Sequence, residues 1–139
     1  MGGNEGLTKK QMEQLSEVFR SEAVEHIKSI AEVLFAIEDG ESSSLEEGVN
    51  RSFREAHSLK GSAGTLGFGR VAVLAHKFED ALGTLKDSKN DLTKKRLEAL
   101  LQALEVIRQA ILQGTPGDDD LTDRETFTIA LLDREFGLD

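Results

Sequence analysis

Residues able to carry out group-transfer chemistry are concentrated around His57. A neutral imidazole is a nucleophile near physiological pH, and either of its ring nitrogens can carry a group. On a helix, Lys60 lies three residues beyond His57 and therefore on the same face. Its ammonium group can offset part of the charge of an arriving phosphoryl group, whereas a lysine taken alone most often only solvates a helix surface.

Two glycines share that face, four and seven residues beyond His57. Gly61 and Gly64 each cost about 1 kcal/mol relative to alanine inside a helix, so their presence calls for an explanation. One explanation is clearance, because a face without side chains lets a partner's active site approach the ring. The other is packing of helices through small residues, or fraying near the helix end for Gly64. The sequence alone leaves both open.

A second pair of polar residues, His76 and Glu79, lies three residues apart beside the apolar stripe of the following helix. A carboxylate that accepts the Nδ1 proton of His57 would leave Nε2 free as the nucleophile, which is the orienting logic of catalytic triads. Glu79 is our candidate for that role. His76 would add a hydrogen bond or help to hold a phosphoryl group, or it is simply a surface histidine.

The remaining histidine, His26, falls within the apolar stripe of the first helix and is interpreted as a core or semi-buried residue. Helical bundles can hold metal ions on inward carboxylates and histidines. Here no Glu-x-x-His pair occurs, the chain has no cysteine, and its three histidines fall on three different helices. We therefore expect no metal site.

Helical periodicity and capping patterns define the elements that must position these groups. Thr8 and Gln11 have capping-box spacing, and a first helix is expected from there to about Gly40. A serine-rich loop follows, and Ser44 with Glu47 predicts the start of a second helix that ends in a glycine-rich stretch. The two apolar stripes are Met12, Leu15, Phe19, Ala23, His26, Ile30, Val33, Leu34 and Ile37, then Leu45, Val49, Ser52, Ala56, Leu59, Ala63 and Leu66.

Three further helices are expected. The third stops around residues 87–90, Asp91 is a candidate cap for the fourth, and the fourth runs to Gly114. Thr122 and Glu125 again have capping-box spacing and predict a short fifth helix. The stripes are Val71, Leu74, Ala75, Phe78, Leu82 and Leu85, then Leu97, Leu100, Leu104, Ile107 and Ile111, and finally Phe127, Leu131 and Phe136.

Four amphipathic helices joined by short loops bury their stripes best as an antiparallel up-and-down bundle, so the predicted fold is all-α. We assign the four-helix bundle to residues 8–114, an acidic loop or linker to residues 115–121, and a short amphipathic helix or tail to residues 122–139. Residues from 115 onward include eight acidic and two basic side chains. The negative charge is therefore concentrated in the C-terminal part.

Composition excludes several classes of protein. The net charge of −9 argues against nucleic acid as a partner, because phosphate contacts need clustered basic residues. No apolar run approaches the roughly 20 residues of a membrane span, and the first residues lack the apolar core of a signal peptide. Without cysteine there are neither disulfides nor thiolate metal sites. We expect a cytoplasmic protein.

The sequence resembles the histidine phosphotransfer domains, most closely the N-terminal phosphotransfer domain of chemotaxis-type histidine kinases. Residues 56–68 match the family's run Ala-His-Ser-(Ile or Leu)-Lys-Gly-x-(Ala or Ser)-Gly-x-x-Gly-Phe throughout. Residues 74–79 match its Leu-Ala-His-x-x-Glu segment, and residues 19–25 resemble the first helix of the chemotaxis subgroup. The pattern that often follows the glutamate, Leu-Leu-Asp-x-x-Arg, is absent from residues 80–86.

The resemblance implies that His57 is the phosphoacceptor and Glu79 its hydrogen-bonding partner. Lys60 and His76 would complete the polar network, and Gly61 and Gly64 match the small positions beside the histidine. The implied partners are a histidine kinase catalytic domain as donor and the aspartate of a response-regulator receiver as acceptor. The chain lacks a Gly-x-x-x-x-Gly-Lys phosphate loop, so ATP and Mg²⁺ are expected on the kinase and Mg²⁺ on the receiver, with no cofactor on this chain.

Two other function classes stay open at this point. A helical interaction module could use the same face only to dock a partner, and a His57→Gln variant that still supported signalling would favour it. An independent enzyme is disfavoured, because the sequence shows no second set of catalytic groups. The early start of the first helix is typical of the N-terminal position in chemotaxis kinases, and we expect the chain to be such a portion rather than a complete protein.

Overall fold

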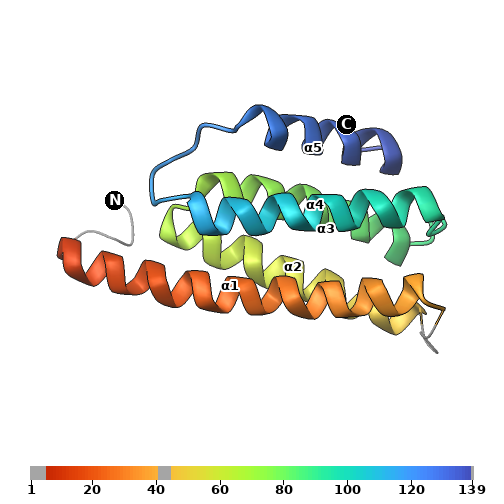
Figure 1. Ribbon diagram of the computed structural model, residues 1–139, viewed down its shortest axis with the longest axis horizontal. Coiled ribbons are helices and arrows are strands. Elements are labelled where there is room, and N and C mark those ends of the chain that lie inside the picture. The colour runs from red at the N-terminus through yellow and green to blue at the C-terminus, as the bar shows by residue number, and fades with distance from the viewer. Residues whose placement is uncertain (1–5, 41–44, 139) are drawn as a thin grey trace.

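The computed structural model describes residues 6–40 and 45–138, and these residues form five helices and no strand. The fold is therefore all-α, as predicted. Figure 1 shows the helices lying roughly parallel or antiparallel to one another along the long axis of the molecule. They are α1 (Lys9–Glu38), α2 (Leu45–Leu66), α3 (Gly69–Lys86), α4 (Lys94–Gln113) and α5 (Asp123–Phe136).

The first four helices form the bundle, and α5 is added outside it. Within the described residues, α1 packs against α2 and α4, and α3 packs against α2 and α4. The fifth helix packs against α3 and α4 alone, on the side of the bundle away from α1 and α2 (Figure 1). Consequently α3 has a neighbour on each side, α2 on one and α5 on the other.

Two of the predicted helix starts are confirmed by their caps. Complete capping boxes join Thr8 to Gln11 and Thr122 to Glu125. Asp91 does not cap α4, because Thr93 lies one residue before the helix and its hydroxyl accepts the Arg96 backbone N–H at 3.2 Å. The predicted loop and cap at Ser42 to Ser44 lie outside the described residues.

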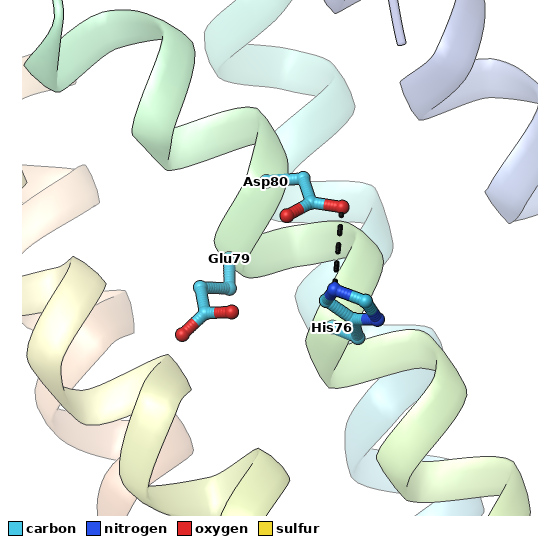
Figure 2. Close-up of side chains that lie close together, drawn as sticks. All are labelled: His76, Glu79 and Asp80. Carbon is cyan, nitrogen blue, oxygen red and sulfur yellow. Dashed lines mark ion pairs between the residues drawn. The ribbon is translucent and has the colours of Figure 1, made fainter. Parts of the chain in front are cut away.

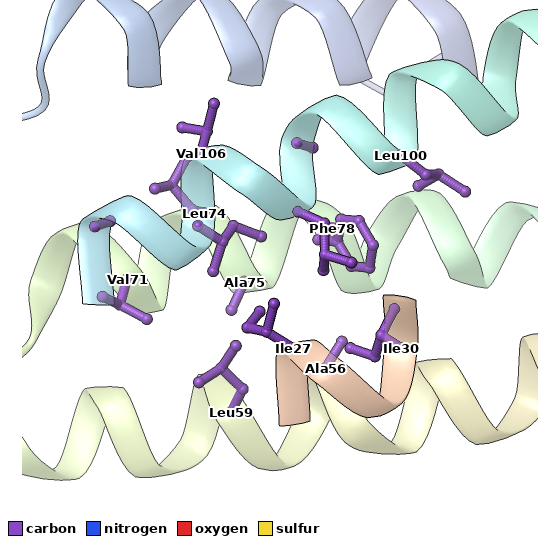
Figure 3. Packing of buried hydrophobic residues seen from close by; sticks show 14 of the residues in the cluster. Ile27, Ile30, Ala56, Leu59, Val71, Leu74, Ala75, Phe78, Leu100 and Val106 are labelled. Atoms are coloured by element: carbon purple, nitrogen blue, oxygen red, sulfur yellow. The ribbon is translucent and has the colours of Figure 1, made fainter. Parts of the chain in front are cut away.

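The core is built from the predicted stripes of α1 to α4, as Figure 3 shows for residues of all four helices. The stripe of α1 differs in detail. Its buried face runs through Ser16, Phe19, Ala23, Ile27, Ile30 and Leu34. Leu15 is 40% exposed, because it lies one position, or about 100°, away from that face. This displaced leucine borders the site described below.

A second buried stripe on α4 accommodates α5. Besides the predicted stripe, α4 buries Ala99, Ala103, Val106 and Ala110, and Val106 points toward α5 in Figure 3. Small residues at spacings of three and four let another helix approach closely. On α5 the buried residues are Glu125, Thr128, Leu132 and Phe136. Phe127, predicted to lie on the apolar face, is 59% exposed because that face passes one position away from it.

None of the described helices is long and apolar enough to cross a membrane.

Candidate functional site

The site is formed where α2 and α3 face each other. His57 is on α2, and its Nδ1–H donates a hydrogen bond to Oε2 of Glu79 on α3. The Glu79 side chain is buried, with 7% of its surface exposed, whereas the His57 side chain is 65% exposed. The ring of His57 is therefore accessible to solvent although its partner is buried. The ring presents its far edge to solvent while its near edge is held by the protein.

Lys60 completes the coordination of the glutamate. Its Nζ donates to Oε1 of Glu79 at 2.7 Å, so each carboxylate oxygen has its own donor. Burial acts to raise the pKa of Glu79, but the hydrogen bonds from Lys60 and His57 outweigh it and hold the pKa below its usual value. Glu79 is therefore an anion at neutral pH. Lys60 neutralises this anion and lies beside the imidazole, on the side of Nδ1.

This arrangement selects one tautomer of His57. A carboxylate accepts but cannot donate when ionised, so Nδ1 carries the proton and Nε2 keeps its lone pair. Because Nδ1 is held by the buried carboxylate and the side chain is 65% exposed, we infer that Nε2 faces solvent. The geometry therefore offers an accessible nitrogen nucleophile, whose conjugate positive charge would be balanced by the buried carboxylate behind it.

The structure tests the helix-packing explanation for the two glycines. A Cβ added to Gly61 or Gly64 would meet nothing within 4 Å among the described residues. By contrast, a Cβ at Gly48 in the same helix would lie 2.9 Å from Cγ1 of Val33, which is the signature of close helix packing. Gly61 and Gly64 are therefore not needed for packing within the chain. They leave the surface beside His57 open.

A shallow groove between α1 and α2 continues this open surface. Sequence reasoning missed it, because whether an apolar residue is left uncovered depends on how α1 is rotated in the bundle. Val18, on the groove, is 54% exposed and lies outside the predicted apolar stripe of α1. The groove is lined by Leu15, Val18, Phe19 and Glu22 of α1 and by His57, Ser58, Gly61, Ser62, Thr65 and Leu66 of α2.

The fourth predicted site residue, His76, is oriented differently from the prediction. Its Nε2 lies 3.6 Å from Oδ2 of Asp80, one turn further along α3, and its side chain is 60% exposed. Figure 2 shows His76 and Asp80 together, while the Glu79 carboxylate extends to the side that faces α2. His76 therefore pairs with Asp80 and lies at the surface, in agreement with the surface-histidine alternative, and a contact with a phosphoryl group stays a prediction.

His76, Glu79 and Asp80 are the residues that could come nearest to a metal site. One ligand atom from each lies within 4.8 Å of the others. However, both oxygens of Glu79 already accept hydrogen bonds, one of them from the ammonium group of Lys60. A cation bound there would therefore lie close to that ammonium group, which opposes its binding.

The remaining histidine lies elsewhere on the α1–α2 interface. Nδ1 of His26 lies 3.4 Å from Oε1 of Glu55, and the His26 side chain is 28% exposed. The semi-buried interpretation is confirmed. His26 forms no part of the His57 cluster.

Comparison with known proteins is consistent with this site. The sequence model of the Hpt domain matches residues 14–110, which include both α2 and α3. The chain is 30% identical over 129 residues to the chemotaxis protein CheA of Halobacterium salinarum, covering 91% of this chain and 19% of that protein. It is 32% identical over 115 residues to CheA of Bacillus subtilis, covering 81% of this chain and 17% of that protein. The chain thus spans less than a fifth of these relatives.

A solved structure shares the fold. It is the phosphorylated P1 domain of CheA3 in complex with CheY6 from R. sphaeroides, with a TM-score of 0.77 and 21% sequence identity. The match covers 89% of this chain and 96% of that one.

Proposed function

Because the chain belongs to the Hpt domain family, we propose that it is a phosphohistidine carrier in which Nε2 of His57 holds the phosphoryl group. One observation carries this proposal. The Nδ1 edge of His57 is fixed by a buried carboxylate, while the ring is 65% exposed beside two glycines with open space around them. A nucleophile with one oriented nitrogen and unobstructed access is what an in-line transfer between two proteins requires.

In the accepting step, the lone pair of Nε2 attacks the γ-phosphorus of ATP held by a kinase domain. The P–N bond forms as the bond to the β-phosphate oxygen breaks, and ADP leaves with that electron pair. The proton on Nδ1 stays in place, so the ring becomes cationic. Glu79, already ionised and hydrogen-bonded to Nδ1, stabilises that charge without any rearrangement of the protein.

In the donating step, a carboxylate oxygen of a receiver aspartate attacks the same phosphorus. The P–N bond breaks and its electron pair returns to Nε2, which regenerates the neutral imidazole. Proton transfer is not needed in either direction. Glu79 and Lys60 therefore act by holding the ring in one orientation and one tautomer, and neither has to exchange a proton.

The relatives suggest which partners take part. Both are chemotaxis proteins, so we place the domain in chemotaxis-type signalling between a histidine kinase catalytic domain and a response-regulator receiver, in the cytoplasm. ATP and Mg²⁺ belong on the kinase and Mg²⁺ on the receiver, because this sequence carries no phosphate loop. The domain is then a carrier and not an enzyme by itself, and the kinase activity belongs to the partner or parent polypeptide.

The test is phosphoryl transfer from radiolabelled ATP with a chemotaxis-type kinase catalytic domain. We expect acid-labile, alkali-stable label on the wild type, none on His57→Gln, and undiminished label on His26→Gln, which removes a histidine outside the cluster. Addition of a receiver domain should then remove the label. Label that persists in His57→Gln, or a wild type that several such kinases fail to label, would leave an interaction module as the better explanation.

A further inference from the structure

Residues 115–138 are fastened to the bundle at several points, although the Hpt domain match ends at residue 110. We refer to residues 115–138, comprising the acidic loop and α5, as the C-terminal brace. We propose that the brace sets the position of α3 at which Glu79 meets His57, with Arg70 and Lys77 as the positioning residues. This inference rests on the proposed function of His57.

The strongest fastening is at the start of α3. Arg70 donates from Nε and from one terminal nitrogen to the two oxygens of Glu125, at 3.0 and 2.7 Å. Its other terminal nitrogen donates to Oδ2 of Asp118 at 2.9 Å. The Arg70 and Glu125 side chains are only 7% and 4% exposed. A buried bidentate pair of this kind fixes both distance and orientation between the two helices.

The brace also holds the turn that joins α2 to α3. The backbone N–H of Gly117 donates to the carbonyl of Gly67 at 2.9 Å. The Asp119 carboxylate lies so close to Gly69 that a Cβ there would be 1.8 Å from Oδ1. Phe68, the N-cap residue, supplies no side-chain hydrogen bond to α3. The acidic loop thus places negative charge at a helix N-terminus that lacks its own cap.

Further contacts hold α3 at its middle and beyond its end. Nζ of Lys77 forms an ion pair with Oδ1 of Asp133 on α5 at 2.7 Å. The Asn90 side chain, in the loop after α3, donates to the carbonyl of Phe136 at 2.9 Å. The brace is therefore attached along the whole length of α3 and does not simply cover one end of it.

These attachments bear on the site through α3 itself. Lys77 precedes Glu79 by two residues, so the two side chains point to roughly opposite sides of α3, one toward α5 and the other toward α2. The hydrogen bond from His57 to Glu79 tolerates a donor–acceptor range of only about half an ångström. If the contacts of the brace were lost, a small shift or rotation of α3 would therefore break the hydrogen bond from His57 Nδ1 to Glu79.

The simpler alternative is that the brace only adds stability. The two roles differ in what they do to His57 in molecules that are still folded. A purely stabilising brace leaves the Nδ1-protonated tautomer and the transfer rate unchanged below the melting temperature. A positioning brace changes both, because the tautomer is held by the contact with Glu79.

The experiment compares Arg70→Met with Arg108→Met in the full chain. Arg108 is a matched control, because it makes a bidentate pair with Glu105 at 2.9 and 2.8 Å that is exposed and confined to α4. Imidazole ¹⁵N shifts of His57 report the tautomer, and phosphorylation is measured per folded molecule. For Arg70→Met we expect a mixture of tautomers and a transfer rate lower by roughly 10-fold, within the range that a misplacement of about 1 Å can produce. For Arg108→Met we expect no change in either.

If Arg70→Met fails to fold, Lys77→Met removes the milder contact and is read in the same way, with a smaller expected loss. Variants that melt at lower temperature yet keep the wild-type tautomer and rate would overturn the inference. The tautomer measurement needs no kinase. A wild type that is never phosphorylated would therefore refute the proposed function, whereas the ¹⁵N shifts would still decide whether the brace positions Glu79.

Discussion

Two buried glutamates, Glu79 and Glu125, are bound by cationic side chains on opposite sides of α3. The two clusters differ in how exposed the partners of the glutamate are. Glu125 accepts two hydrogen bonds from Arg70, whose side chain is 7% exposed, and one from the backbone N–H of Thr122. Glu79 receives one from Lys60 and one from His57, whose ring is 65% exposed. The first cluster is closed, and its groups are all satisfied within the protein. The second leaves one ring nitrogen accessible.

The comparison separates the energetics of stability from those of function. In both clusters burial acts to raise the pKa of the carboxyl group, and hydrogen bonds from the cationic partner lower it overall. The arginine fork of the closed cluster fixes two helices in place. In the open cluster a histidine donates to the glutamate instead of an arginine. A titratable, nucleophilic ring can be oriented by the carboxylate and can also form a bond to a third group.

Breaking the closed cluster should have the largest effect on stability. Replacing Arg70 with alanine leaves the buried Glu125 without its charge partner, and removal of one member of a buried pair costs about 3–5 kcal/mol. We expect the free energy of unfolding, measured with urea, to fall by about that amount. Arg108→Ala, which opens an exposed pair, should leave it nearly unchanged, because solvent screens such a pair. Equal losses in the two variants would contradict the distinction between closed and exposed pairs.

Breaking the open cluster should affect transfer more than stability. Glu79→Gln keeps the shape of the side chain but removes the anion and allows the amide to donate instead of accept. Loss of such an orienting partner typically costs 10–100-fold, so we expect phosphorylation of His57 to slow by roughly that factor. The measurement is the initial rate of label incorporation with a fixed kinase concentration. A rate within twofold of wild type would show that Glu79 is not the orienting group.

Adding a side chain to the open face beside His57 should raise stability and slow phosphoryl transfer. Gly61→Ala adds a methyl group where a Cβ meets no described atom within 4 Å, and alanine is favoured over glycine in a helix by about 1 kcal/mol. We expect the free energy of unfolding to rise by about that amount while transfer from the kinase becomes slower. Gly48→Ala is the control, because its Cβ would lie 2.9 Å from Cγ1 of Val33 and should not stabilise. Faster transfer in Gly61→Ala would argue against the clearance role.

Acid should weaken both clusters, with the smallest effect near neutral pH. The pKa of Glu125 in the folded protein lies below the usual value of 4.5, so between these two values the unfolded chain binds more protons. The stabilisation is therefore complete above about pH 4.5 and is lost as the pH falls through the folded-state pKa. Glu125→Gln should flatten the dependence of urea stability on pH in that range. An unchanged slope would mean that other carboxylates control acid unfolding.

Much of the fold follows from local patterns. The four bundle helices and the short fifth helix follow from apolar periodicity and capping boxes such as Thr8 with Gln11, since these interactions span only a few residues. Two of the errors concern residues whose burial depends on how a neighbouring helix packs. Leu15 and Phe127 are exposed because each lies one position away from the buried face that its helix actually uses.

The site likewise has features that the sequence predicted and features that it did not. The type and spacing of His57, Lys60 and the two glycines, together with the family run that contains them, predicted the chemistry before any contact was known. The pairing of His76 with Asp80 was not foreseen, although a spacing of four residues on one helix is a visible signal for it. No comparable spacing in the sequence predicts the groove beside His57.

The sequence by itself determined that the chain is helical and predicted His57 as its reactive residue, because periodicity, caps and side-chain chemistry are local properties. Only the tertiary structure decided which atoms meet. The hydrogen bond from His57 to Glu79 joins residues 22 apart, and the bonds from Arg70 to Glu125 join residues 55 apart. Such contacts depend on how whole helices are rotated and shifted against one another, and that register is fixed by the sum of their packing.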